Sequence, residues 1–197
     1  MNYLLWFSLF SFLTFSSPNS FQTTSPCLHP NEAELAELVN EYREENDLPP
    51  IPLSKSLTIV AKAHVADLYG NKPFDESNCN PHSWSGMGKW EACCYSYTTH
   101  NGPCMWNKPR EITEYQGDGF EIVMYSEDSK FPEKTVSPHE ALEAWVNSKN
   151  HDGVILNKGI WAKVEWNAMG VGIHKGYAAV WFGREKDSSG KVGECND

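Results

Sequence analysis

Six cysteines constrain this 197-residue chain more than any other feature, because all of them lie after residue 26. An even number of cysteines in an exported chain predicts disulfide bonds, since oxidising compartments let such bonds persist. Neighbouring cysteines are not expected to pair with each other, because the small ring would strain the peptide bond between them. No Cys-x-x-Cys pair is present to favour a zinc knot instead. The predicted disulfide cysteines are Cys27, Cys79, Cys93, Cys94, Cys104 and Cys195.

The positions of these cysteines also indicate what the bonds would hold together. Cys27 and Cys195 lie near the two ends of the mature chain and are expected to join them. The remaining four would then fasten residues 79–104, with their pairing left open beyond the exclusion of Cys93 with Cys94.

An uncharged apolar run over residues 4–15 precedes all the cysteines. Its length is typical of a signal peptide and falls short of the roughly 20 residues of a spanning helix. We therefore expect residues 1–20 to be a signal peptide, with cleavage between Ser16 and Ser20, and the protein to be secreted and extracellular. A buried N-terminal core helix is the alternative. No later run is apolar enough to predict a transmembrane segment.

The charge balance and the missing motifs exclude several classes of function. Lysine and arginine total 16 against 26 aspartate and glutamate residues, which gives a formal net charge of −10. Such a chain offers no cationic surface for phosphate backbones, so no nucleic-acid partner is expected. The sequence also lacks a Gly-x-Ser-x-Gly elbow, a phosphate-binding loop and a Gly-x-Gly-x-x-Gly motif, which argues against serine hydrolases and nucleotide-binding enzymes.

Two segments near the start of the mature chain have the apolar spacing of amphipathic helices. The first covers residues 31–47, and Asn31 is expected to cap it together with Glu34. The second covers residues 55–69 behind an N-cap at Ser54.

Gly70 is expected to end the second helix, and the character of the sequence changes soon after it. Between residues 73 and 118 the periodicity disappears, and Gly, Pro, Cys, Trp and Tyr dominate. Such a segment is typically held by cross-links and aromatic packing. Its rings would either pack on the disulfides as a substitute core or form a platform for sugars or a partner protein. These rings are Trp84, Trp90, Tyr95, Tyr97 and Trp106.

The rest of the chain alternates strands and a helix. Residues 119–125 predict a strand, a third helix begins after Ser137, and residues 168–174 and 177–184 predict a closing hairpin. Helices alternating with strands around one sheet indicate the α/β class, with a three-layer α-β-α sandwich over residues 27–197 as a single domain.

Three polar residues stand out as candidates for chemistry. His82 lies in the loop-rich stretch, Glu121 lies within an apolar strand, and His151 lies where the third helix ends. A lone carboxylate in such a strand is costly unless it is paired or borders a cleft. Two imidazoles and one carboxylate suit Zn²⁺ with one position open to water, and they also suit acid–base chemistry with Glu121 as base. His64, on the buried stripe of the second helix, is expected to be a core histidine bonded to the backbone.

Read in order, these segments resemble the CAP superfamily, which comprises cysteine-rich secretory proteins, antigen 5 and pathogenesis-related class 1 proteins, over about residues 32–184. The resemblance implies that His82, Glu121 and His151 share a cleft and that residues 73–118 contain a cysteine-rich insertion. It rests on the motifs at residues 38–43, 48–66, 82–83, 119–122, 144–156, 169–173 and 181–183.

Two positions depart from the animal and plant branches of that superfamily. Asn147 stands where those branches have a second glutamate, and Ile160 stands where they have their second histidine. His151 lies in a Trp-x-x-Ser-x-x-His pattern similar to that of the bacterial branch and is expected to take that histidine's place.

We therefore expect a secreted, disulfide-linked CAP domain, present as a monomer, whose cleft can bind a divalent metal such as Zn²⁺. The resemblance implies an extracellular effector or binding role rather than an enzymatic one, because the missing carboxylate removes a general base. The alternatives are a zinc-assisted peptidase or other hydrolase, and a carbohydrate- or lipid-binding module. The expected partners are an extracellular protein, a lipid or sterol, or a glycan.

Overall fold

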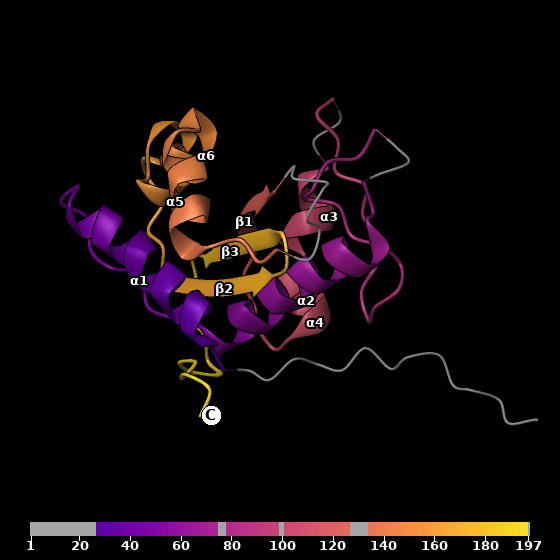
Figure 1. Ribbon diagram of the computed structural model, residues 1–197, viewed down its shortest axis with the longest axis horizontal. Helices are drawn as coiled ribbons and strands as arrows, with labels where there is room; N and C mark the ends of the chain where they lie inside the picture. The colour runs from indigo at the N-terminus through magenta and orange to yellow at the C-terminus, as the bar shows by residue number, and fades with distance from the viewer. Residues whose placement is uncertain (1–26, 75–77, 99–100, 127–133, 197) are drawn as a thin grey trace, which may run out of the picture.

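The computed structural model describes residues 27–74, 78–98, 101–126 and 134–196 (Figure 1). The expected signal peptide and its cleavage region lie outside these residues. Within the described ranges, no helix is long and apolar enough to cross a membrane.

The centre of the fold is an antiparallel sheet of three strands in the order β1-β3-β2. The strands are β1 (Gly119–Tyr125), β2 (Ala168–His174) and β3 (Tyr177–Gly183). The predicted strands are therefore confirmed, with β3 one residue shorter than expected. The register places Glu121 of β1 opposite Trp181 of β3, and side chains alternate between the two faces along each strand. Glu121 and Trp181 consequently point to the same face of the sheet.

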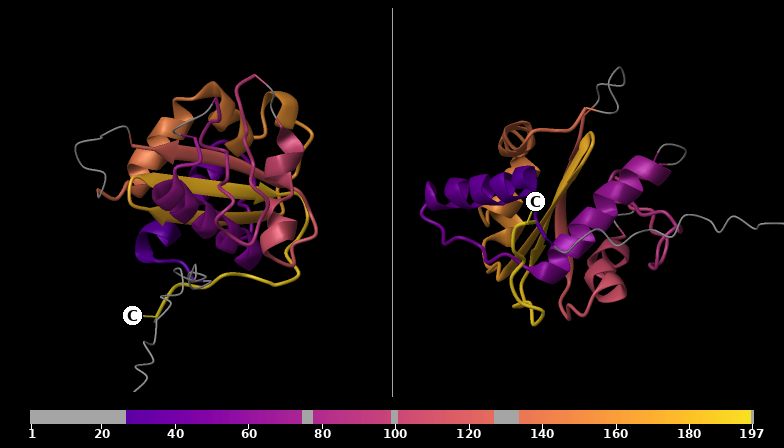
Figure 2. Two further views of the ribbon diagram at one scale, coloured as in Figure 1. Left: turned by 90° about the vertical axis from the view of Figure 1, so that its right-hand side faces the viewer. Right: turned by 60° about the horizontal axis from the view of Figure 1, so that its bottom comes forward.

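Helices cover both faces of the sheet, which confirms the predicted α-β-α sandwich. One layer contains α1 (Pro30–Glu44), α5 (Pro138–Val146) and α6 (Lys149–Ile155), followed by the short helix η1 (Gly159–Trp161). The other contains α2 (Lys55–Asn71), α3 (Gly102–Trp106) and α4 (Lys108–Ile112). In the right-hand view of Figure 2 the sheet is seen nearly edge-on between α1 and α2.

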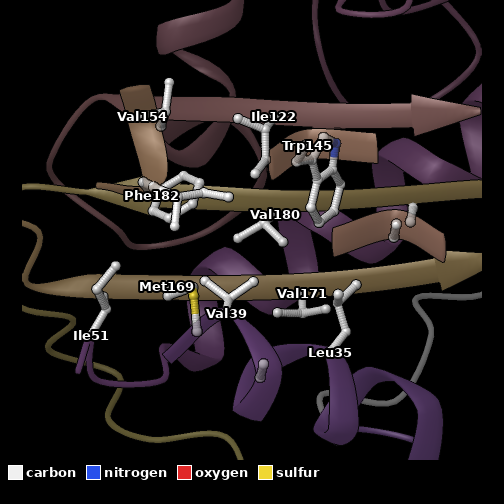
Figure 3. Close-up of a cluster of buried hydrophobic side chains, with 14 of the residues drawn as sticks. Leu35, Val39, Ile51, Ile122, Trp145, Val154, Met169, Val171, Val180 and Phe182 are labelled. Atoms are coloured by element: carbon white, nitrogen blue, oxygen red, sulfur yellow. The ribbon is translucent and has the colours of Figure 1, made fainter. Parts of the chain in front are cut away.

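The sheet separates two hydrophobic cores. The core beneath α1, α5 and α6 is filled by alternate strand residues together with the apolar faces of these helices (Figure 3). Its members include Leu35, Val39, Ile51, Ile122, Trp145, Val154, Met169, Val171, Val180 and Phe182. The second core lies on the α2 face and includes Trp84 and Trp181. The candidate carboxylate Glu121 points into this second layer.

Two glycines of β2 let α2 lie directly on the sheet. A Cβ atom built on Gly170 would fall 2.0 Å from the backbone carbon of Leu57, and one on Gly172 would fall 2.6 Å from that of Ala61. Because neither contact is with a movable side chain, only glycine fits at these positions. This contact sets the distance between α2 and the sheet, and therefore which residues of β1 the side chains of α2 can contact.

The first helix begins earlier than predicted. Its N-cap is His29, and the partner in the capping box is Glu32, so the expectation of Asn31 and Glu34 is wrong. Pro30 explains the shift, because proline is favoured at the first helical position, where no N–H needs a partner. The buried Glu32 accepts a hydrogen bond of 2.8 Å from the backbone N–H of His29 and pairs at 2.8 Å with Lys62 of α2.

The second helix begins as predicted and ends later. The hydroxyl of Ser54 accepts a hydrogen bond of 3.0 Å from the N–H of Leu57, which confirms the N-cap. Gly70, expected to be the stop, is still helical, and Lys72 takes the left-handed conformation with φ of 44°. The side chain of Asn71 donates to Asp67 at 2.7 Å and so extends the last turn.

The disulfide predictions are confirmed and completed. Cys27 pairs with Cys195, Cys79 with Cys94, and Cys93 with Cys104, so the neighbouring cysteines do not bond to each other. The first bond joins the two ends of the described domain. The other two fasten residues 79–104, as expected, and Cys104 lies within α3.

The aromatic residues of residues 73–118 serve mainly as packing. Trp84 is buried in the second core, and Trp90 and Tyr95 pack against it. Tyr97 and Trp106 are exposed. Trp84, Trp90 and Tyr95 therefore act as a substitute core, as the first interpretation predicted. Of the rings in the predicted platform, Tyr97 and Trp106 are the ones exposed to solvent. The two short helices α3 and α4 in this region were not predicted.

The contact between α2 and β2 predicts that one added methyl group at Gly170 will strongly destabilise the fold. Gly170→Ala should lower the free energy of unfolding by about 3 kcal/mol, because the added Cβ meets backbone that cannot rotate away. Gly70→Ala is the matched control: its Cβ meets nothing within 4 Å in a helix, so it should stabilise by about 0.5–1 kcal/mol. Urea denaturation measures both, and a Gly170→Ala protein as stable as wild type would contradict the packing described.

Candidate functional site

The site is built around the carboxylate of Glu121 on β1. Its side chain is fully buried beneath α2. One oxygen, Oε2, accepts a hydrogen bond of 2.8 Å from Nδ1 of His82, which lies in the loop after α2. The other, Oε1, is hydrogen-bonded to Nδ1 of His64 on α2. Two of the three predicted site residues, His82 and Glu121, are thus brought together, and His64 joins them.

His64 was assigned to the core by the sequence, and half of that assignment is correct. Its Nε2 contacts the backbone carbonyl of Ser83 at 3.0 Å, as expected for a core histidine. Its other nitrogen binds the candidate carboxylate, which was not predicted. The sequence did contain a signal for this contact, because a polar residue on the buried face of a helix and a carboxylate in a buried strand each need a hydrogen-bond partner. That these two residues are each other's partner follows only from the packing of α2 on the sheet.

Aromatic rings hold His64 in place. The ring stacks on Trp84 with a centroid distance of 4.1 Å and an interplanar angle of 7°. Trp181 contacts it edge-on at 6.1 Å. Because the imidazole is fixed by one ring on its face and another at its edge, its two nitrogens are aimed at Ser83 and Glu121.

The surroundings keep Glu121 ionised. Burial by itself raises the pKa of this carboxyl group, but attraction to His64 and the hydrogen bonds from His64 and His82 outweigh it. The result is a pKa lowered from 4.5 to about 2. Both carboxylate oxygens therefore act as acceptors at neutral pH.

His151 lies in the opposite layer, on α6 rather than at the end of the third helix as predicted, and it is near enough for the charges of His82 and Glu121 to act on it. Burial lowers its pKa, a positive charge on His82 lowers it further, and the carboxylate of Glu121 opposes both effects. His151 is half-buried. The helix that carries it is anchored to α1, because the hydroxyl of Tyr42 donates to Asp152 at 2.8 Å and the buried Arg43 donates to the carbonyl of Ile155.

The hydrogen bonds determine which atoms of the site remain available to a ligand. Both oxygens of Glu121 and both nitrogens of His64 have partners. Within the described part of the chain, no hydrogen bond uses Nε2 of His82, whose side chain is 20% exposed. Across the same residues, no group of three or more His, Cys, Asp or Glu side chains is arranged to hold a metal ion. Nε2 of His82 is therefore a nitrogen of this site without a hydrogen-bond partner among the described residues.

The two positions that depart from the family pattern offer neither a carboxylate nor an imidazole, since they are Asn147 and Ile160. Ile160 on η1 is 88% exposed. Asn147 caps the end of α5 and lines a surface cavity of about 350 Å³ together with Met124, Val136 and Glu143. The carboxylate that is hydrogen-bonded to His82 is that of Glu121.

Comparison with known proteins identifies similar sequences and folds. The sequence model of the Cysteine-rich secretory protein family, CAP, matches residues 36–182. Among curated proteins, none matches this sequence.

Two solved structures are similar in fold. An extracellular protein containing an SCP domain from Bacillus anthracis str. Ames is 19% identical with a TM-score of 0.54, covering 79% of this chain and 40% of its own. This chain thus spans about two-fifths of that protein. An outer surface protein from Borrelia burgdorferi is 15% identical with a TM-score of 0.50, covering 79% of this chain and 93% of its own.

The ionised state of Glu121 predicts a pH dependence of stability. Because its pKa is about 2 in the folded protein and near 4.5 when unfolded, its contribution is complete above pH 4.5 and is lost as the pH falls toward 2. At about 1.4 kcal/mol per pKa unit, the wild-type protein should lose roughly 3 kcal/mol over this range. Glu121→Gln should remove that slope, as measured by urea denaturation at a series of pH values.

Glu140 provides the matched control for this experiment. Its pKa is also lowered to about 2, through hydrogen bonds to the backbone of Ser137 and to Lys134, but its side chain is exposed. Solvent and salt screen such a group. Glu140→Gln should therefore leave most of the slope intact, and equal slopes for wild type and Glu121→Gln would contradict the assignment.

Proposed function

Because this chain belongs to the cysteine-rich secretory protein family, CAP, we propose that it is an exported binding protein whose cleft holds a divalent metal ion through His82 and His151. The family match covers most of the chain, and three disulfides hold the described domain together. Bonds of this kind persist in oxidising compartments. Together with the apolar run at residues 4–15, they support secretion.

The observation that carries the proposal is the hydrogen bond between His82 and Glu121. An ionised carboxylate can only accept, so Nδ1 of His82 carries the hydrogen at this 2.8 Å contact. A neutral His82 ring then has its lone pair on Nε2, directed away from Glu121. Metal-binding histidines are commonly oriented in this way by a carboxylate.

His151 supplies the second donor in this proposal. Burial lowers its pKa, so the ring is neutral and keeps a lone pair at neutral pH. Neutral imidazoles suit Zn²⁺ and Cu²⁺ among divalent metals. When bound, Zn²⁺ would supply a Lewis-acidic centre with positions open to water or to a group of a partner.

The same hydrogen bonds favour a binding role over a peptidase or other hydrolase. Glu121 is buried with both oxygens accepting from histidines, so it is poorly placed to remove a proton from water. Asn147 offers no replacement base. The proposed partners are an extracellular protein, a lipid or sterol, or a glycan, and the monomeric state is still a prediction.

Isothermal titration with Zn²⁺ tests the proposed site. The wild-type protein should bind one equivalent, His82→Ala and His151→Ala should each weaken binding at least tenfold, and the double variant should not bind. Glu121→Gln should weaken binding by about 10- to 100-fold, because it acts through the orientation of His82. His139→Ala is the matched control, since this histidine is 73% exposed on α5 and should leave the affinity unchanged.

Two outcomes would count against the proposal. Zinc binding by the double variant with wild-type affinity would place the metal elsewhere. Cleavage of a peptide library that is abolished by a chelator would show that the site is catalytic, and we expect no such cleavage.

A further inference from the structure

A groove of about 840 Å³ lies at one end of the sheet, apart from the proposed metal site. The strand register places the starts of β1 and β2 beside the end of β3, because Gly119 and Ala168 both lie opposite Gly183. The chain segments next to these three strand ends line the groove together with α4. Its volume falls within the roughly 300–1,000 Å³ of ligand-binding clefts. The residues of the proposed metal site are not among the described residues that line it.

The groove carries an excess of positive charge, in contrast to the chain as a whole. Its cations are Arg110, Arg184 and Lys186, and its anions are Asp118 and Glu185, whereas the whole chain has a formal net charge of −10. Arg110 on α4 pairs with Asp118 at 2.7 Å. Among the described residues, no carboxylate pairs with Arg184 or Lys186, and both side chains are exposed. These two cations are therefore available to a negatively charged ligand.

An aromatic ring holds the guanidinium group of Arg184 in place. Its central carbon lies 4.7 Å from the centre of the Phe120 ring, which is a favourable position for a cation. Phe120 is itself buried near the start of β1. Because this contact uses the face of the guanidinium group and not its N–H groups, those groups can still bind a carboxylate or a sulfate through parallel hydrogen bonds.

Two partly exposed tryptophans contact the same phenylalanine. The ring of Trp106, on α3, lies 5.9 Å from that of Phe120 and is 36% exposed. The ring of Trp161, on η1, lies 5.2 Å from Phe120 and is half-buried. An indole ring presents a large, flat apolar surface. Since Arg184 contacts Phe120 as well, a cation and two such surfaces lie around one ring.

Hydrogen bonds fix the segment that carries Arg184. The side chain of Asn167 donates to the carbonyl of Arg184 at 2.9 Å, and the buried hydroxyl of Tyr115 donates to the carbonyl of Glu185 at 2.6 Å. The side-chain oxygen of Asn167 has no donor among the described residues, so it can accept a hydrogen bond from a ligand. Because the segment is already ordered, binding costs less conformational entropy.

We propose that this groove binds an acidic saccharide, a sugar chain that carries carboxylate or sulfate groups. Arg184 and Lys186 bind the negative groups. Trp106 and Trp161 pack against the apolar face of a sugar ring, and Asn167 accepts a hydrogen bond from a sugar hydroxyl. An acidic peptide would supply carboxylates but no flat ring that carries hydroxyl groups. The inference rests on the proposed extracellular binding role and does not depend on its metal site.

Isothermal titration of the whole protein in the presence of EDTA tests the inference. The probes are a tetrasaccharide of galacturonic acid, a sulfated tetrasaccharide, a neutral tetrasaccharide of galactose and a hexaglutamate peptide. At least one of the two charged sugars should bind, with an affinity that falls as salt is added. The better of the two identifies the negative group that the groove recognises. The neutral sugar and the peptide should bind at least tenfold more weakly. Failure of both charged sugars to bind overturns the inference, as does equal binding of the neutral sugar or the peptide.

Arg184→Met and Lys186→Gln test the two cations. Methionine keeps an apolar stem against Phe120 but removes the guanidinium group, so the affinity for the charged sugar should fall about tenfold. Lys186→Gln should lower it about threefold, because an exposed ammonium group contributes less. Lys134→Gln is the matched control, since this lysine is 58% exposed, does not line the groove and should leave the affinity unchanged. Wild-type affinity in Arg184→Met overturns the inference.

Trp106→Leu tests the aromatic surface. Leucine offers no flat ring, so the affinity for the charged sugar should fall about fivefold. Tyr97→Leu is the matched control, because Tyr97 is 74% exposed and does not line the groove, and it should bind as the wild type does. Equal losses in the two variants, or no loss in folded Trp106→Leu, contradict the assigned surface.

Failure of this inference and failure of the proposed metal site give different results. The double variant His82→Ala, His151→Ala should still bind the charged sugar, and Arg184→Met should bind Zn²⁺ as the wild type does. Binding of the sugar without any binding of Zn²⁺ would remove the metal site alone. Binding of Zn²⁺ without any binding of a charged sugar would overturn this inference alone.

Discussion

A carboxylate buried within a β-strand must receive hydrogen bonds from its surroundings, and the residues around Glu121 meet that requirement. Glu121 has donors on both oxygens, one from α2 and one from the loop that follows it. Each donor depends on a different structural feature: the glycines of β2 bring α2 close enough, and the disulfides of residues 79–104 hold the loop. The fold and the site are thus linked through one acidic side chain.

This arrangement changes the role of Glu121 from that expected of a ligand or base. A metal ligand needs a free lone pair directed at the metal, and a general base needs access to the proton that it removes. The side chain of Glu121 is fully buried and each of its oxygens already accepts a hydrogen bond from a histidine, so neither oxygen is exposed to solvent. In the proposed function its part is to hold the hydrogen of His82 on Nδ1, and the imidazole nitrogens are the groups that would bind a metal.

The sequence predicted those parts of the structure that local patterns determine. The strands, the caps at Ser54 and Ser137 and the pairing of Cys27 with Cys195 follow from alternation, side-chain chemistry and position along the chain. The start of α1 was wrong because Pro30 and Asn31 are both plausible first-turn residues, and local patterns alone do not rank them. The helices α3 and α4 are too short to show a period. The grouping of His82 with Glu121 was predicted only through the family resemblance.

His64 shows why the remainder of the site was out of reach. On a helical stripe it has the same spacing as its apolar neighbours, and its partner lies on β1, 57 positions further along the chain. Nothing local distinguishes a histidine that only fills space from one that is hydrogen-bonded to a buried carboxylate. The distinction depends on which strand residue faces it, and that is set by the register of β1 with β3 and by the contact of α2 with two glycines. When a sequence predicts a buried polar residue in a helix and a buried acid in a strand, the two should therefore be considered possible hydrogen-bond partners. Only the structure shows whether they lie close enough to bond.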